Sequence, residues 1–368
     1  MPSPRIEAVR ECLAAVQHPS FARSLIELDL VADLAATDDA ASMKVTIHAA
    51  SDALRAELRA RIEGALAPLG IREVGIEWDL QVPIRRVGND DPIPGVKNVV
   101  LVMSGKGGVG KSTVATNLAL ALARAGTRVG LLDADIYGPS LPTMLGLSGH
   151  PKAKDDKTIE PLQRFGLKLM SIGFMLENDK DAIIWRGPML QGALMQFLAD
   201  VDWGELDYLV LDLPPGTGDV ALTLAQKLRT TGAVIVTTPQ EVALQDVYKS
   251  VSMCKKLNIP VLGVIENMSY FVDSAGVRQE IFGAGGGAKV AEHAEAPLLA
   301  QIPLDTSVRE WGDKGTPIVQ AEPGRPAALA FAAAADALAT RIAVESFVLG
   351  GGAKAPDAKG QKRLKIVR

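Results

Sequence analysis

The sequence has few cysteines, no long apolar run and no excess of positive charge. Cys12 and Cys254 are the two cysteines in 368 residues, which excludes a disulfide framework and a C-x-x-C motif. Residues 1–5 carry no apolar signal region, and no uncharged apolar run approaches the roughly 20 residues that cross a bilayer. The formal net charge of −4 argues against a dedicated nucleic-acid binder. We therefore expect a cytoplasmic protein, with neither a membrane nor a nucleic acid among its partners.

The chain is long enough and apolar enough for two domains. Of its 368 residues, 48% are hydrophobic and 22% are charged, so a sizeable core can form. We predict a small α+β domain over residues 1–82, a linker over 83–96, a second domain over 97–345 and a flexible basic tail over 346–368. Prolines around a polar segment indicate the linker, and three successive glycines followed by lysines and arginines indicate the tail.

Periodic apolar patterns define the first domain. Ser51 precedes Leu54, Leu58 and Ile62 at helical spacing, so we predict that it caps a helix ending near residue 66. The predicted elements in chain order are a helix over 6–16, strands over 25–34 and 43–48, the capped helix, and a strand over 74–80.

From residue 97 onward the sequence alternates between apolar strands and helices. Near-continuous apolar runs predict strands at 99–103, 129–132, 206–211, 233–236 and 261–265. Such runs are typical of a parallel sheet whose two faces are both covered by helices. The predicted fold class is therefore α/β, a mostly parallel sheet with helices on both faces, preceded by the small α+β domain.

A glycine-rich turn follows the first of these strands. Residues 105–112 read G-x-x-x-x-G-K-S, and a helical pattern begins directly after them. Glycines let the backbone curl so that several N–H groups point at one anion, with the positive end of a helix behind them. Lys111 can then reach the terminal phosphates of a nucleotide, and Ser112 can bind Mg²⁺. The predicted nucleotide-binding residues of this turn are Gly105, Lys106, Gly107, Gly108, Val109, Gly110, Lys111, Ser112 and Thr113.

The same glycines also match a dinucleotide-binding pattern. Gly105, Gly107 and Gly110 spell G-x-G-x-x-G, and Asp133 follows roughly 20 residues later, where a ribose-binding carboxylate would lie. A dinucleotide fold has no use for the Lys-Ser-Thr sequence after the last glycine. A later strand also ends in Asp212, which suits Mg²⁺. The mononucleotide interpretation is therefore favoured.

Carboxylates follow several of the predicted strands. Asp133 and Asp135 come after the second strand, Asp212 comes after the third, and Glu266 comes after the fifth. Ligands of open parallel sheets bind at the carboxyl ends of the strands, so these side chains are expected near the glycine turn. Hard oxygen ligands suit Mg²⁺, and we predict that Ser112 binds it and that Asp212 contacts it, either directly or through another of its ligands. We predict that Asp135 orients the water that attacks the terminal phosphate, because phosphoryl transfer depends mainly on positioning.

Several segments resemble one family of ATPases. With Lys106 the turn reads G-K-G-G-V-G-K-S-T, which resembles the deviant P-loop of the dimeric ATPases that include MinD, ParA and the nitrogenase iron protein. Other segments narrow the resemblance to the Mrp/ApbC family of iron–sulfur cluster carriers over about residues 97–343, and the small domain resembles a module often fused to bacterial members. These segments are D-A-D-I-Y-G-P-S at 133–140, D-L-P-P-G-T-G-D at 212–219, E-N-M-S-Y at 266–270 and I-F-G at 281–283 with G-G at 286–287.

The resemblance implies an ATP-hydrolysing homodimer that delivers iron–sulfur clusters to apoproteins. In this family Lys106 would cross to the nucleotide of the partner subunit, whereas Lys111 and Ser112 would serve their own ATP and Mg²⁺. The implied catalytic residues are Lys106, Lys111 and Asp135. Asn267 would contact the adenine and favour ATP over GTP. The implied partners are a second copy of the chain, apoprotein clients and cluster-assembly proteins.

One segment departs from the family pattern. Many members carry C-x-x-C shortly after the Asn-Met-Ser segment, where paired subunits bridge a [4Fe–4S] cluster, but residues 270–277 of this chain contain no cysteine. Iron–sulfur clusters need soft sulfur ligands, and Cys254 is expected to be a small buried apolar side chain. No cluster ligands are identified. The alternative function is a positioning ATPase like MinD or ParA, which binds a surface or a partner in an ATP-dependent way.

Overall fold

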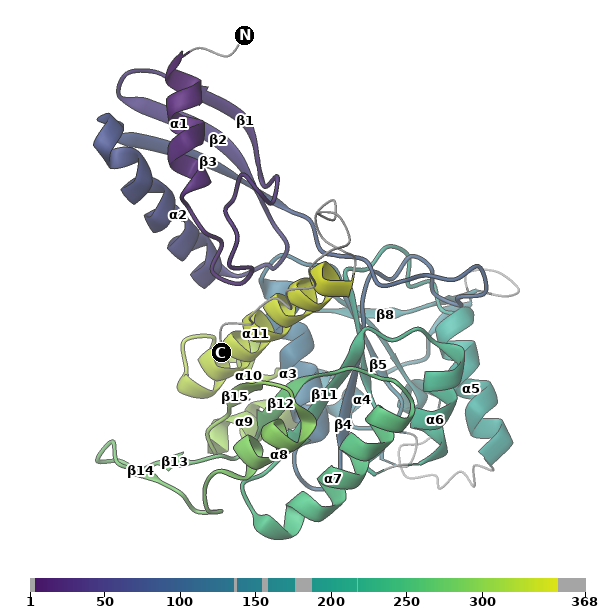
Figure 1. The fold of residues 1–368 in the computed structure, drawn as a ribbon. Helices are drawn as coiled ribbons and strands as arrows, with labels where there is room; N and C mark the ends of the chain where they lie inside the picture. Colours follow the sequence, from purple (N-terminus) through teal and green to yellow (C-terminus); the bar gives the residue numbers. More distant parts are fainter. Residues whose placement is uncertain (1–3, 136–137, 154–157, 176–186, 217, 350–368) are drawn as a thin grey trace. The chain divides into compact units, whose positions relative to one another are not determined.

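The computed structural model describes residues 4–135, 138–153, 158–175, 187–216 and 218–349 (Figure 1). Contacts within the chain group it into two units. The first, the N-terminal unit, consists of Met1–Pro83 with Ala339–Arg368. The second, the sheet unit, consists of Ile84–Leu338.

The N-terminal unit is built on a three-stranded sheet. Strands β1 and β2 pair antiparallel and β2 and β3 pair parallel, in the order β1-β2-β3. A parallel pair needs a crossover connection, which helix α2 supplies between β2 and β3. The elements are α1 (Pro4–Ala14), β1 (Val31–Ala36), β2 (Ala40–Ile47), α2 (Asp52–Leu66), the 3₁₀ turn η1 (Ala67–Leu69) and β3 (Glu73–Leu80). This arrangement confirms the predicted small α+β fold.

Helix α2 begins where its sequence predicts. The Ser51 hydroxyl accepts a hydrogen bond from the backbone N–H of Leu54 at 3.1 Å, which caps the N-terminus of the helix. Leu54, Leu58 and Ile62 are buried along one face of the helix. Burial of this apolar stripe fixes the rotation of the helix about its own axis.

The strand predicted over residues 25–34 is wrong in its first half. Strand β1 begins only at Val31, and Asp29, in the turns before it, has a φ of +55°. The Ser24 hydroxyl accepts a hydrogen bond from the backbone N–H of Glu27, and the Glu27 carboxylate accepts one from the N–H of Ser24. These reciprocal local bonds hold a turn where the alternating apolar pattern alone favours a strand.

The sheet unit contains an eight-stranded sheet in the order β15-β12-β11-β4-β10-β5-β9-β8. Neighbouring strands are parallel except β8 and β9, which pair antiparallel at one edge. The strands are β4 (Val99–Ser104), β5 (Val129–Asp133), β8 (Leu162–Arg164), β9 (Leu167–Ser171), β10 (Tyr208–Asp212), β11 (Gly232–Thr237), β12 (Val261–Glu266) and β15 (Leu298–Gln301). Every residue of the central strands β4, β5, β10 and β11 is buried. The predicted mostly parallel α/β sheet is confirmed.

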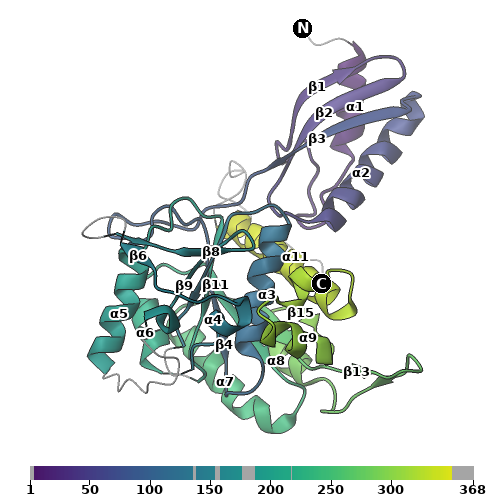
Figure 2. The same ribbon diagram turned by 180° about the vertical axis from the view of Figure 1, so that it is seen from behind.

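Helices cover both faces of this sheet. Helices α6 and α7 lie in front of it in Figure 1, whereas α3 and α4 lie in front in the opposite view of Figure 2. The helices are α3 (Lys111–Arg124), α4 (Leu141–Leu145), α5 (Gly187–Ala199), α6 (Asp219–Lys227), α7 (Glu241–Lys256), α8 (Gly286–Ala294), α9 (Thr306–Asp313), α10 (Ile318–Ala321) and α11 (Pro326–Leu349). The shorter elements are the 3₁₀ turn η2 (Ile172–Met175) and the two-stranded pairs β6 (Lys152–Ala153) with β7 (Ile159–Glu160) and β13 (Phe271–Val272) with β14 (Arg278–Gln279).

The segment predicted as a linker is attached to the sheet unit from residue 84 onward. The Arg85 guanidinium forms a buried ion pair with Asp91. It also donates hydrogen bonds to the backbone carbonyl groups of Ile93, Val96 and Arg229. Two buried charges are tolerated here because each is paired and hydrogen-bonded.

Helix α11 extends beyond the predicted end of the second domain at residue 345. It continues to Leu349, so the first residues of the predicted tail are helical, and the rest of that tail, 350–368, lies outside the described residues. In the part of the chain that the structure describes, the segment Pro326–Phe347 is the one helix long and apolar enough to cross a membrane. Half of its most apolar window is buried inside the protein, and Phe331 and Leu338 are fully buried, as in the core helix of a globular fold.

Candidate functional site

The glycine turn lies between β4 and α3, near the middle of the sheet. Strand β4 ends at Ser104 and helix α3 begins at Lys111, so residues 105–110 form the turn. Gly108 and Gly110 have φ angles of +83° and +80°, in the left-handed region that favours glycine. The first turn of a helix has backbone N–H groups without partners inside the helix, so the start of α3 suits an anion.

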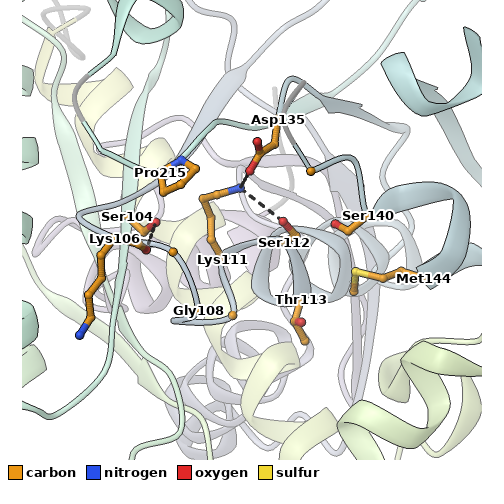
Figure 3. Close-up of a pocket in the computed structure, with 13 residues that line it drawn as sticks. Ser104, Lys106, Gly108, Lys111, Ser112, Thr113, Asp135, Ser140, Met144 and Pro215 are labelled. Carbon is orange, nitrogen blue, oxygen red and sulfur yellow. Dashed lines mark hydrogen bonds and ion pairs between the residues drawn. The ribbon is translucent and has the colours of Figure 1, made fainter. Parts of the chain in front are cut away.

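A pocket opens over this turn (Figure 3). Its walls come from the turn, the first residues of α3, the segment after β5 and the loop after β10. The lining residues are Ser104, Lys106, Gly107, Gly108, Gly110, Lys111, Ser112, Thr113, Asp135, Gly138, Ser140, Met144 and Pro215. Most of the residues that the sequence predicts for nucleotide binding therefore border one cavity, together with Asp135 from a different strand end.

The Lys111 amine is the centre of the charged contacts in this pocket. It forms ion pairs with the carboxylates of Asp212 and Asp135, the latter at 3.6 Å, and lies 3.3 Å from the Ser112 hydroxyl. Figure 3 shows Lys111, Ser112 and Asp135 converging on the same space. The Lys111 and Asp212 side chains are 6% and 1% exposed, so these charges interact with little screening by water.

Asp212 lies at the carboxyl end of β10, and one of its two carboxylate oxygens is available to a ligand. Its Oδ2 atom is buried and makes no hydrogen bond within the described part of the chain. Burial raises the pKa of Asp212, although the Lys111 amine and the Ser112 hydroxyl act in the opposite direction. A buried carboxylate oxygen without a partner, beside a serine hydroxyl, fits the hard oxygen ligands that Mg²⁺ prefers.

Asp133 holds the segment that carries Asp135. Its carboxylate accepts hydrogen bonds from the backbone N–H groups of Asp135, Ser140 and Leu141 and from the Ser171 hydroxyl. Burial and the nearby Asp212 raise the pKa of Asp133 to about 7. Because it is fully buried and already bonded, Asp133 is not placed to bind a ribose, which removes the dinucleotide interpretation.

Lys106 borders the pocket, but its side chain points in a different direction from that of Lys111. Figure 3 shows its amine pointing away from Lys111 and Asp135. Among the ion pairs of the described residues, none includes Lys106. Its backbone is fixed, because the Lys106 carbonyl accepts a hydrogen bond from the Ser104 hydroxyl at 3.1 Å.

Asn267 and Glu266 do not line the pocket. The Asn267 side chain donates a hydrogen bond to the Val109 carbonyl of the glycine turn at 2.9 Å, and its contact with adenine stays a prediction. The Glu266 carboxylate accepts hydrogen bonds from Ser269, from the backbone N–H of Gly287 and from Gln301. Glu266 follows a strand end as Asp212 does, but its oxygens bind these structural partners.

The structure adds residues to the site that received no role from the sequence. Ser140, Met144 and Pro215 border the pocket, and the Ser140 Oγ atom is buried without a hydrogen bond inside the described ranges. Ser140 and Pro215 follow shortly after the ends of two predicted strands, and this position is the sequence feature that indicates a place near the site. Met144 lies on the short helix α4, which no apolar pattern marked.

Neither cysteine belongs to a group of metal ligands within the described residues. Cys254 is fully buried in the sheet unit with its thiol 3.7 Å from the sulfur of Met103, and burial raises its pKa to about 11, so the thiolate is disfavoured. Cys12 lies in the N-terminal unit and is half-buried. Within the described residues, no group of three or more His, Cys, Asp and Glu side chains could hold a metal ion. A magnesium ion at Asp212 and Ser112 would therefore need phosphate oxygens and water as further ligands.

Two family models match the chain. Residues 95–339 match the family described as NUBPL iron-transfer P-loop NTPase, and residues 6–78 match the family described as iron–sulfur cluster assembly protein. An iron–sulfur cluster carrier protein of Deinococcus radiodurans is 46% identical over 343 residues, covering 92% of this chain and 96% of the relative. The iron–sulfur cluster carrier protein of Escherichia coli strain K12 is 45% identical over 351 residues, with 92% and 93% covered.

Solved structures agree with the sheet unit. A nucleotide-binding protein from Archaeoglobus fulgidus in complex with ADP is 40% identical, with a TM-score of 0.56, covering 66% of this chain and 96% of that one. The cell division ATPase MinD of Pyrococcus furiosus is 24% identical, with a TM-score of 0.50, covering 66% and 98%. The second likeness concerns the fold alone.

Proposed function

Because the chain belongs to the family of NUBPL iron-transfer P-loop NTPases, we propose that it is an ATP-binding and ATP-hydrolysing iron–sulfur cluster carrier that delivers clusters to apoproteins. The observation that supports this proposal most is the pocket over the glycine turn, where Lys111, Ser112 and Asp135 meet. The curated relatives that match over nine-tenths of the chain are named iron–sulfur cluster carrier proteins.

The turn and helix α3 would bind the phosphates of ATP. Backbone N–H groups around Gly108 and Gly110 would face the phosphate oxygens, and the Lys111 amine would leave its carboxylate partners to contact the terminal phosphates. Ser112 and Asp212 would hold a magnesium ion. When bound, this ion would neutralise charge on the phosphate oxygens.

Asp135 would orient the attacking water. Asp135 lines the pocket, and the Asp133 carboxylate accepts a hydrogen bond from its backbone N–H. Hydrolysis of ATP needs a water in line with the terminal phosphate more than it needs covalent chemistry. We also propose that the chain acts as a cytoplasmic homodimer in which Lys106 contacts the nucleotide of the partner subunit.

An iron–sulfur cluster would be the cargo of this protein rather than its resident cofactor. One chain does not supply four thiolates for a cluster, since it has two cysteines and Cys254 is fully buried, so a carried cluster would take further ligands from a partner. The alternative of a positioning ATPase has support only from the fold, which MinD shares.

Anaerobic cluster transfer tests this proposal. The protein is incubated with iron and sulfide, freed of excess reagent, and mixed with an apoprotein whose activity needs a [4Fe–4S] cluster, with and without ATP. We expect bound iron and sulfide in the parent protein and ATP-dependent activation of the client. The variant Lys111→Ala should lose the ATP dependence, while the exposed-site control Lys289→Ala should keep it. A protein that binds no iron and activates no client would refute carriage.

A further inference from the structure

Asn267 contacts the glycine turn from a distant strand. It directly follows strand β12, which is separated from β4 in the sheet by β11. Its backbone N–H donates a hydrogen bond to the Thr237 carbonyl at the end of β11. Its side-chain Nδ2 atom donates a second hydrogen bond to the Val109 carbonyl, at 2.9 Å. Since a carbonyl oxygen can only accept, the nitrogen of the Asn267 amide must face it. Asn267 is 5% exposed, so this bond is shielded from water.

The residues on both sides of Asn267 fix its position. The buried Glu266 carboxylate accepts hydrogen bonds from the backbone N–H of Gly287 at the start of α8 and from Gln301 on β15. Met268 has a φ of +53°, a left-handed conformation that is uncommon for a residue with a side chain. The Asn267 amide is therefore held in place from neighbouring elements before any ligand binds.

The glycine at position 110 makes this contact possible. A Cβ atom placed on Gly110 would lie 2.3 Å from the Asn267 Nδ2 atom, closer than real Cβ contacts come. The same residue has a φ of +80°, which also favours glycine. Gly110 therefore serves the approach of Asn267 as well as the curvature of the turn.

Fixing the Val109 carbonyl also fixes the next N–H group. In a planar trans peptide, the C=O of Val109 and the N–H of Gly110 point in opposite directions. With the carbonyl bound to Asn267, the N–H is directed to the other side of the turn. Gly110 lines the pocket, so this N–H is one of the donors available to a phosphate oxygen.

We propose that Asn267 is a positioning residue, whose side chain acts on the nucleotide through the Val109–Gly110 peptide and thereby strengthens phosphate binding whichever base the nucleotide carries. This inference rests on the proposed nucleotide-binding function. It adds a second role to the adenine contact that the family resemblance implies, and a ligand without a base isolates that second role.

Titration with three magnesium-loaded ligands separates the two roles. ADP, GDP and inorganic tripolyphosphate, which has no base, are titrated into the parent protein and into Asn267→Ala and Asn267→Asp. The first variant removes the side-chain donor, and the second replaces it with an acceptor while keeping the shape. We expect all three affinities, including that of the base-free tripolyphosphate, to fall by about tenfold, the effect of one lost hydrogen bond.

A buried asparagine outside the pocket provides the control. Asn98 is 1% exposed and donates to the Asp207 carbonyl, so Asn98→Asp makes the same chemical change in the core. It should lower the melting temperature but leave all three affinities of the folded protein unaltered. A loss confined to ADP, or unchanged affinities in both Asn267 variants, would overturn the inference. A parent protein that binds none of the three ligands would refute the proposed function and the inference with it.

Discussion

At the scale of single residues, carboxyl groups outnumber amines in the immediate surroundings of Lys111. The Lys111 amine faces Asp135 and Asp212, and the buried carboxyl of Asp133 lies behind them. A triphosphate adds further negative charge, and charges interact strongly where water is excluded. A magnesium ion and, in the proposed homodimer, the partner's Lys106 would each reduce this repulsion. This charge balance is a physical reason for two lysines in one short turn.

Stability of the N-terminal unit should depend on the protonation of His18. Burial, with help from His48 and Arg61, lowers its pKa to about 4, and its Nδ1 atom accepts a hydrogen bond from the N–H of Ser20. The unfolded chain binds a proton below about pH 6.5, whereas the folded chain does not bind it until about pH 4. The free energy of unfolding should therefore fall as the pH is lowered through this range, by at most about 1.4 kcal/mol per pH unit.

Hydrogen exchange of the amides of helix α2, measured between pH 4 and 7 and corrected for intrinsic exchange, checks this dependence. The variant His18→Gln should show a flatter pH profile, while His293→Gln, in the sheet unit, should reproduce the parent profile. Parallel profiles for His18→Gln and the parent protein would show that this histidine does not control the stability of the unit.

The residues of the turn could be predicted from the sequence, but the role of Glu266 could not. The phosphate-binding pattern is local, because the glycines, Lys111 and Ser112 follow one another along the chain. Glu266 also follows a strand end, and in the sequence it resembles Asp212. What distinguishes it are hydrogen bonds from Gly287 and Gln301, which come from segments far along the chain. Only the folded structure brings these groups together.

At the scale of elements, the glycine turn is packed against helix α7. A Cβ atom on Gly105 would lie 2.4 Å from the backbone nitrogen of Val247 and 2.5 Å from the carbonyl carbon of Asp246. Backbone atoms of a helix cannot move aside as a flexible side chain can. The close approach of α7 therefore requires glycine at this position and fixes where the turn begins.

The variant Gly105→Ala should destabilise the protein in the absence of nucleotide. We expect a loss of about 1–3 kcal/mol in the free energy of unfolding, since the added methyl group would force the turn and α7 apart. Denaturant unfolding of the sheet unit measures this loss. Gly107→Ala is the matched control, because a Cβ atom there meets nothing within 4 Å and the φ of Gly107 is not positive. Equal stability of the two variants would contradict this packing argument.

Central strands were easier to predict than edge strands and turns. Strands such as β4 and β10 are buried on both faces, so their sequences are continuous apolar runs. Strands β8 and β15 lie at the two edges of the sheet and are only partly buried, so their sequences carry a weaker pattern. The pair β13 and β14 has only two residues in each strand, too few for periodicity to appear.

At the scale of the whole molecule, Lys106 indicates an incomplete site. Its amine points away from Lys111 and Asp135, although its backbone borders the same pocket (Figure 3). A lysine at this position that does not serve its own pocket is consistent with a partner subunit that receives it. The proposed homodimer gives each nucleotide one lysine from each chain.

Mixing two inactive variants tests this arrangement. Lys106→Ala and Lys111→Ala should each hydrolyse ATP very slowly as homodimers. When they are mixed in equal amounts, each heterodimer regains one complete site, which combines Lys111 of one chain with Lys106 of the other. With random exchange, activity should recover to about a quarter of the parent rate, because half of the dimers are mixed and each has one working site. A mixture that stays inactive after subunit exchange would show that Lys106 acts within its own chain.

The proposed function depends on phosphate binding by the pocket over the glycine turn. Calorimetric titration of Mg-ADP into the parent protein and into Lys111→Ala tests this binding most directly. We predict saturable binding by the parent protein and an affinity at least about tenfold lower in the variant, the effect of losing a charged hydrogen-bond donor. Absence of binding by the parent protein, or equal affinities for the two proteins, would contradict phosphate binding at this turn.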